Sequence, residues 1–225
     1  MSDQLPKYTV LRARERIEPD ARWEKQAWDR VPSLTLSHWM GELPAHRPDT
    51  YAKLLYDETF LYVIFRVEDT YVRCAVTDYQ GPVCTDSCAE FFFTPGTNLE
   101  DGYFNLETNC GGTILFMHQL ARDMHCFAMA AELGRALAVA HSMPRLVDPE
   151  IAKPTTWCVE YRIPYAALAP YAPVTRPAPG VLWRANFYKC GDSTSHPHWL
   201  TWAKVDWPKP DFHRKEFFGE LWFGE

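Results

Sequence analysis

Asp86-Ser87-Cys88-Ala89-Glu90-Phe91-Phe92-Phe93 and Tyr103-Phe104-Asn105-Leu106-Glu107-Thr108-Asn109 are the two stretches that decide the fold of this chain. In each, one face is apolar and the other carries polar groups such as Glu90, Glu107 and Asn109. Because successive side chains of a strand point to opposite faces, the alternation predicts two strands, each with one buried and one solvated face. Carboxylates, amides and aromatic rings on that second face suit recognition of sugar hydroxyl groups. They suit an ordinary amphipathic sheet equally well.

Short strands separated by turn signals follow one another along most of the chain. The expected strands are residues 51–56, 60–68, 88–94, 103–108, 113–118, 137–142, 157–163, 182–189 and 220–223. Turn signals such as Asp57-Glu58, Asp101-Gly102 and Gly111-Gly112 lie between them. About nine short strands at hairpin spacing predict an all-β, antiparallel β-sandwich of the jelly-roll or immunoglobulin-like type.

Helical patterns are few. Residues 23–28 predict one or two helical turns, and residues 164–168 predict a short helix with proline in its first turn. Residues 126–139 are rich in Ala, Leu and Met but contain Gly134, so we expect an exposed loop with helical character and then a strand. The proline-rich residues 170–179 are expected to form a loop. Strands resume directly after it, so residues 1–225 are expected to form one domain.

Composition and charge exclude several classes of protein. The formal charge of −6 and the lack of a basic patch argue against a nucleic-acid partner. No apolar segment is long enough to span a membrane, so no membrane partner is expected. Residues 1–18 are polar and lack the apolar run of a signal peptide, which predicts a cytoplasmic location, or secretion if a leader has been removed. The seven cysteines form no CxxC pair and are expected to be reduced, buried thiols.

The ordered set of strands resembles the family-nine carbohydrate-binding modules and their DOMON-like relatives over roughly residues 15–225. The matching segments are residues 54–57, 60–63, 86–92, 103–109 followed by Gly112, 157–160 with 163–164, 183–188, 212–213 and 218–221. The resemblance implies a β-sandwich with a slot near one end of a sheet. In that family the slot holds the reducing-end sugar of a glucan or xylan chain between two tryptophans, with polar side chains on its hydroxyl groups.

Four positions of this chain carry over from the family pattern. By the resemblance, Glu90 matches the carboxylate of the Asp-Ser strand, and Asn109 the amide that closes the Tyr-Phe strand. Asn186 matches the amide after the Trp183 strand start, and either Trp199 or Trp202 matches the second clamp residue.

Two positions depart from the family pattern. Cys84 stands where the first clamp tryptophan would be, with Tyr79 as a candidate substitute ring. Glu107 stands where some binders have arginine. Both changes weaken the expectation of a tight clamp on a glucan end.

The expected ligand-binding set combines polar contacts with an aromatic platform. Its members are Glu90, Glu107, Asn109, Arg184, Asn186, Tyr188, Trp199 and Trp202. A satisfied cross-strand network is the competing interpretation of the polar members. No catalytic residue is expected, although neighbouring carboxylates at Glu90 and Glu107 are also what a glycosidase needs.

No metal ligand is expected at this site, and no cofactor is expected. Asp57, Asp69 and Asp86 could supply oxygens to a structural Ca²⁺, although acidic turn residues usually cap a turn or face solvent. His196 and His198 with Asp192 lack a third strong ligand for a transition metal. The sequence therefore predicts a non-catalytic binder of a sugar, or of the end of an oligosaccharide of glucan or xylan type. The alternatives are a glycan-active hydrolase that uses the paired carboxylates, and a degenerate sandwich that serves as a protein-interaction module.

Overall fold

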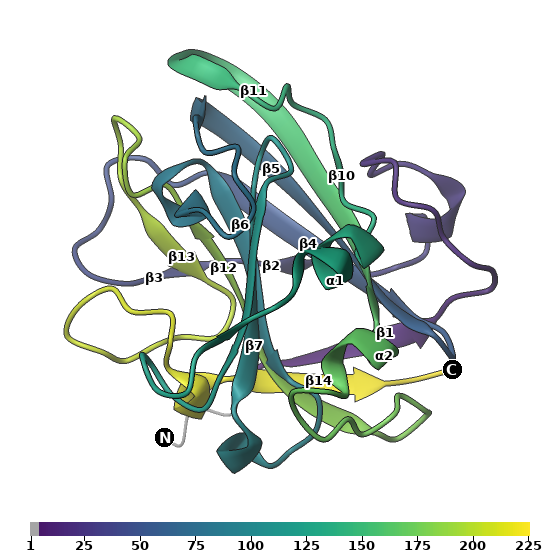
Figure 1. Cartoon of the computed structure of the whole chain (residues 1–225). Helices are drawn as coiled ribbons and strands as arrows, with labels where there is room; N and C mark the ends of the chain where they lie inside the picture. Colours follow the sequence, from purple (N-terminus) through teal and green to yellow (C-terminus); the bar gives the residue numbers. More distant parts are fainter. Residues whose placement is uncertain (1–4) are drawn as a thin grey trace.

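A computed structural model of the chain describes residues 5–225, whose strands form one curled, mixed sheet (Figure 1). The strand order is β10-β11-β5-β4-β1-β14-β12-β6-β7-β8-β9. Strand β1 (Lys7–Arg12) joins two halves of this sheet, since residues 7–10 pair with β14 and residues 11–12 pair with β4. The halves face each other across the core, where Phe65 and Phe187 are 6.0 Å apart between ring centroids. The predicted β-sandwich class is confirmed.

The two halves of the sheet contain the following elements. One half, which carries the candidate site, consists of β14 (Gly219–Phe223), β12 (Leu182–Cys190), β6 (Cys88–Thr94), β7 (Tyr103–Asn109), β8 (Ile114–Gln119), β9 (Phe127–Ala128), β13 (Trp199–Thr201) and β3 (His38–Trp39). The other consists of β10 (Ala140–His141), β11 (Val147–Pro164), β5 (Phe60–Cys74), β4 (Asp49–Tyr56) and β2 (Leu34–Thr35). The helices are α1 (Ala131–Ala136) and α2 (Tyr165–Leu168), with 3-10 turns η1 (Gln26–Trp28), η2 (Val83–Thr85), η3 (Leu99–Asp101) and η4 (Lys215–Phe217). None of the helices in the described part is long and apolar enough to cross a membrane.

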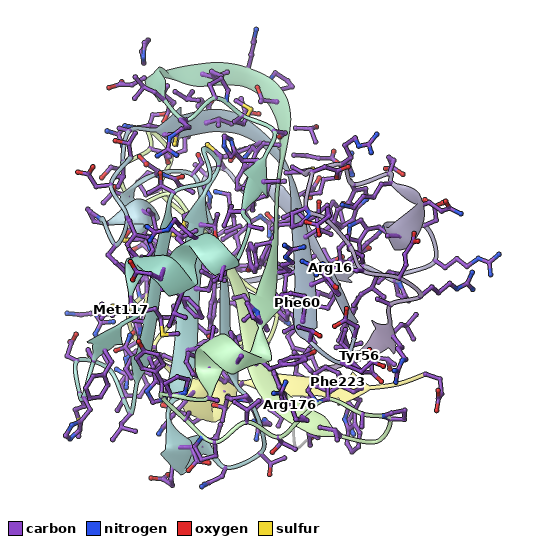
Figure 2. All side chains as sticks on the ribbon, turned by 45° about the vertical axis from the view of Figure 1, so that its right-hand side comes forward. Arg16, Tyr56, Phe60, Met117, Arg176 and Phe223 are labelled. Carbon is purple, nitrogen blue, oxygen red and sulfur yellow. The ribbon has the colours of Figure 1, made fainter. Side chains whose placement is uncertain are left out.

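Strand pairing differs from the prediction at β1, which is parallel to both of its neighbours. The rest of the pairing among the described strands is antiparallel. Tyr56 of β4 and Phe223 of β14 meet edge to face, with ring centroids 5.1 Å apart, beside this junction (Figure 2). A parallel arrangement places the two ends of the chain in one sheet, and no local sequence signal encodes such a contact.

Strands β5 and β11 are longer than predicted, because polar residues near their paired ends interrupt the alternation of apolar and polar side chains that indicates a strand. Residues 69–74 and 147–156 carry acidic, basic and proline side chains, yet they extend the ladder as far as the Val147–Cys74 pair. Between residues 126 and 142, the expected loop and strand are observed as β9, α1 and β10.

The inner face of β6 forms the centre of the core, as the alternation predicts. Phe91 stacks on Phe93 at 4.5 Å and on Phe187 at 4.8 Å between ring centroids. The outer face departs from the prediction, because it is covered rather than solvated. Every residue of β6 and β7 is buried, and a second apolar cluster on the outer side contains Phe92 and Phe212, with the Tyr188 ring in contact with both. The segment that follows β13 supplies this cover.

A buried polar network links the two halves near the ends of β5 and β12. Lys189 Nζ lies 3.6 Å from Asp69 Oδ2 and 2.7 Å from His198 Nε2, and all three side chains are buried. His46 Nε2 contacts the other Asp69 oxygen at 2.7 Å. Since Lys189 donates to Nε2, the proton of the neutral His198 ring lies on Nδ1, which donates to the His196 carbonyl at 2.9 Å. The network therefore pairs a lysine with a carboxylate and keeps the histidine neutral.

This network predicts a loss of stability in acid. Burial, and then the Lys189 charge, lower the pKa of His198 to about 3. Below the unfolded-state pKa of about 6.5, His198 is protonated in the unfolded chain but stays neutral in the folded chain. The free energy of unfolding therefore falls as the pH falls. Between about pH 7.5 and about pH 5, we expect the free energy of unfolding to fall by about 2 kcal/mol less in His198→Gln than in the unsubstituted chain. Urea unfolding at both pH values measures this difference. The exposed His125→Gln serves as the control, and an equal pH dependence in both variants would contradict a neutral, buried His198.

Candidate functional site

A pocket of about 180 Å³ lies on the outer face of the sheet, where β6, β7 and the end of β12 meet the segment after β13. Its lining is Cys84, Glu90, Glu107, Arg122, Cys190, Asp192, Trp199, Pro210, Asp211, Phe212 and His213. Pockets for drug-sized ligands measure about 300–1,000 Å³. This one therefore suits about one sugar ring.

The floor of the pocket carries two carboxyl groups on adjacent strands. Glu90 of β6 and Glu107 of β7 are directly opposite each other in the antiparallel register, and their residues are only 2% and 6% exposed. Burial, and then the neighbouring Glu107, raise the pKa of Glu90 well above its ordinary value. Burial also raises the pKa of Glu107 to about 7, and Asp192 adds to this rise. The floor is thus a polar surface on which negative charge is costly.

A chain of amide side chains fixes the orientation of Glu107. Gln119 Nε2 donates to Asn105 Oδ1 at 2.8 Å, and Asn105 Nδ2 donates to Glu107 Oε1 at 3.0 Å. Asn105 and Glu107 lie two residues apart on β7 and so share its outer face. The second Glu107 oxygen makes no hydrogen bond to the described residues. It remains available to a ligand in the pocket.

One wall of the pocket is aromatic. Trp199 of β13 lines it half-buried, and its Nε1 donates to Asp192 Oδ1 at 2.9 Å. Cys84, at the position of the missing clamp tryptophan, lines the same pocket from η2. Tyr79 does not line this pocket; its hydroxyl donates to the Met129 carbonyl at 2.8 Å, and its ring lines a separate cavity beside α1. The described lining thus contains a single tryptophan wall.

Charged side chains lie at the rim of the pocket. Arg122 and Arg214 both pair with Asp211, Arg214 at 2.7 Å. Tyr103 Oη donates to His213 Nδ1 at 2.8 Å. Burial, and then Arg122, lower the pKa of His213 to about 4, so this ring is neutral at physiological pH. The rim can therefore offer a partly exposed guanidinium to a ligand.

The structure brings Glu90, Glu107 and Trp199 of the expected ligand-binding set together at the pocket. The other five members make internal contacts instead. Asn109 donates to Asp86 Oδ2 and the Val76 carbonyl, Arg184 donates to the carbonyls of Phe218 and Gly219, and Asn186 binds both backbone groups of Ala203. Tyr188 stacks on Phe212 at 4.2 Å and donates to its carbonyl, and Trp202 packs in the core against Phe187 at 5.6 Å. Asn109, Arg184, Asn186 and Tyr188 lie on the expected outer face but bond to neighbouring segments, whereas Trp202 lies in the core.

Several pocket residues escaped sequence reasoning. The sequence suggests Asp192, just after β12, only as a metal ligand beside His196 and His198, while Arg122, Asp211 and His213 lie in turns far from β6 along the chain. Cys190 continues the alternation of β12 onto the outer face, and this is the one signal that could have placed it.

The three acidic residues considered for Ca²⁺ each have protein donors of their own. Asp57 accepts from the backbone of Thr59 and Phe60 and from the Tyr62 hydroxyl. Asp69 belongs to the buried lysine network, and Asp86 accepts from an arginine, an asparagine and two backbone amides. Their contacts are those of structural anchors.

Comparison with known proteins places the chain in a family. Residues 23–223 match the model of carbohydrate-binding family 9. A search of curated proteins found no match. A structure from Bacteroides uniformis ATCC 8492, for whose protein carbohydrate binding is proposed, aligns with a TM-score of 0.87 at 24% identity and covers 98% of this chain and 100% of its own.

Two further structures are of a family-nine carbohydrate-binding module from Caldicellulosiruptor kristjanssonii. The complex with cellotriose aligns with a TM-score of 0.64 at 13% identity, covering 97% of this chain and 93% of that one. The complex with glucose aligns with a TM-score of 0.62 at 12% identity, covering 96% and 95%. These likenesses show a shared β-sandwich fold. Together with the family match over nearly its whole length, they show that the chain belongs to carbohydrate-binding family 9.

Proposed function

We propose that the chain is a non-catalytic binder that holds one sugar residue, or the end of an oligosaccharide of glucan or xylan type, in the pocket beside Trp199. The observation that carries this proposal is the convergence of one half-buried tryptophan and two floor carboxyl groups in a pocket of about 180 Å³. Family membership supports the ligand class, and the family-nine module that aligns with this chain has been solved with glucose and with cellotriose.

The pocket contains the two kinds of surface that a sugar ring needs. The indole face of Trp199 can pack against the apolar C–H face of the ring. The carboxyl groups of Glu90 and Glu107 can accept hydrogen bonds from hydroxyl groups, and they also donate when protonated. Because Cys84 replaces a second aromatic wall, the ring would be stacked on one side only. We therefore expect weaker affinity than a two-tryptophan clamp provides.

The first experiment is a titration of intrinsic tryptophan fluorescence with glucose, xylose, cellobiose and xylobiose, each beside its borohydride-reduced alditol. A response to the free sugars that vanishes for the alditols would support binding of a reducing end. Equal responses to both forms would move the site to the interior of a glycan chain. No response to any sugar up to about 10 mM, a level that corresponds to less than about 3 kcal/mol of binding free energy, would favour the protein-interaction alternative.

Trp199→Ala is expected to weaken sugar binding at least about tenfold, or about 1.4 kcal/mol, because it removes the stacking surface. Isothermal titration calorimetry measures this loss without relying on the missing fluorophore. Trp222→Ala is the matched control, since Trp222 is an exposed tryptophan of β14 that does not line the pocket. Equal affinity in the two variants would show that Trp199 is not the platform.

A further inference from the structure

Two thiols and a carboxyl group converge at the floor of the pocket. Cys88 of β6 and Cys190 of β12 are directly opposite each other in the antiparallel register. Glu90 lies two residues after Cys88 and therefore points to the same outer face. Cys190 Sγ lies 3.1 Å from Glu90 Oε1, and one donor atom from each of the three residues lies within 4.8 Å of the others.

The spacing of these donor atoms fits a tetrahedral ion. Zinc bonds of about 2.0–2.3 Å place the ligand atoms of a tetrahedral site about 3.3–3.8 Å apart. The three donor atoms lie within 4.8 Å of one another, an upper limit about 1 Å above this range, and the three side chains project from two paired strands rather than from loops.

The floor also carries two buried carboxyl groups that form no ion pair. None of the ion pairs among the described residues involves Glu90 or Glu107. Both carboxyl groups are almost fully buried. Buried carboxylates are normally paired or coordinate a metal, because an uncompensated charge in the interior is costly. The second oxygen of Glu107 makes no hydrogen bond to the described residues, and Glu107 lines the same pocket.

The chemistry of the donors selects the kind of metal. Thiolates are soft ligands that favour Zn²⁺ over Ca²⁺ and Mg²⁺, which take oxygen ligands only. A bound Zn²⁺ would displace the thiol protons and offset the cost of the buried negative charges.

We propose that Cys88, Glu90 and Cys190 form a Zn²⁺ site at the floor of the pocket, with the fourth coordination position open toward the pocket. Glu107 stands opposite Glu90 and acts as an outer partner, held by Asn105. Three protein ligands and one open position are the arrangement in which zinc binds a water or a further ligand. This proposal goes beyond carbohydrate binding and does not depend on it.

The test uses the reduced chain, stripped of metal with EDTA and kept free of sugar. Titration with Co²⁺ should produce a thiolate-to-cobalt charge-transfer band that saturates at one ion per chain and disappears when Zn²⁺ is added. Cys88→Ser and Cys190→Ser should each weaken Zn²⁺ binding at least about 100-fold, because loss of even an outer-shell partner costs about 10–100-fold. Cys74→Ser is the matched control, as Cys74 is a buried thiol of β5 outside the trio.

A second measurement needs no variant and so does not depend on their folding. X-ray absorption of the Zn²⁺-loaded chain should show two sulfur neighbours at about 2.3 Å and oxygen neighbours at about 2.0–2.2 Å. Oxygen and nitrogen neighbours alone, full binding by Cys88→Ser and Cys190→Ser, or loss of binding in Cys74→Ser would each overturn the site. A Cys88–Cys190 disulfide that forms even in the presence of Zn²⁺ would overturn it as well, because the strand partners would then be joined covalently.

Discussion

Asp86→Ala is expected to lower the free energy of unfolding by about 3–5 kcal/mol, the range observed when a buried charged partner is removed. The Asp86 side chain is fully buried and accepts four hydrogen bonds, from Arg73 at 2.8 Å, from the amides of Ala75 and Val76 at 3.0 and 2.8 Å, and from Asn109 at 3.0 Å. The substitution leaves four donors without their acceptor. Urea unfolding followed by circular dichroism measures the effect.

The contacts of Asp86 also position one wall of the pocket. They fix the segment from residue 75 to residue 86, and this segment carries Cys84 to the pocket wall. Asp78→Ala is the control, because Asp78 is an exposed carboxylate of the same segment, and its loss is expected to cost less than about 0.5 kcal/mol. Similar stability in the two variants would show that the Asp86 contacts are replaced by water.

Lys189→Met is expected to cost about 3–5 kcal/mol, because it leaves Asp69 as a buried charge without its lysine. Lys189 also donates to the Cys190 carbonyl at 2.8 Å and lies 5.8 Å from the centre of the Trp157 ring. Methionine retains most of the side-chain volume, so the effect isolates the charge rather than a cavity. Chemical denaturation at neutral pH measures it, with the exposed Lys204→Met as control.

A double substitution separates pairing from simple loss of a polar group. Adding Asp69→Asn to Lys189→Met removes both charges, and we expect the double variant to recover about 1–3 kcal/mol relative to the lysine variant alone. Additive losses would show that the two side chains do not interact, and that the 3.6 Å separation of Nζ and Oδ2 contributes little.

Much of the fold follows from local patterns. The bounds of β6 equal those predicted, and those of β4, β7, β8, β12 and β14 differ from the prediction by at most two residues at either end. Alternation succeeds there because the inner faces bury an apolar residue at every second position, as Phe91 and Phe93 show. It fails at β1 and at the extensions of β5 and β11, where the partner strand supplies the backbone hydrogen bonds and the side chains need not be apolar.

The candidate site was only partly accessible to sequence reasoning. The pairing of Glu90 with Glu107 could be predicted, because a face and a neighbouring strand suffice to define it. The roles of Asn186 and Tyr188 could not, since residues 203–212 return over β12 and take up their hydrogen bonds and surfaces. Trp202 instead packs in the core against Phe187. Cys88 and Cys190 were two ordinary buried thiols in the sequence, and their register across β6 and β12 is what brings them face to face.

The sequence by itself determined the β-sandwich class, the inner faces of its strands and the family, because these depend on alternation and on the order of short motifs. Tertiary structure alone decided which side of the sheet is covered, which polar groups remain free, and which charges lack a partner. The physical reason is that burial of the outer face comes from the segment after β13, which is distant along the chain from β6 and β7. The pKa of a carboxyl group such as Glu90 is raised only when this segment covers it and excludes water.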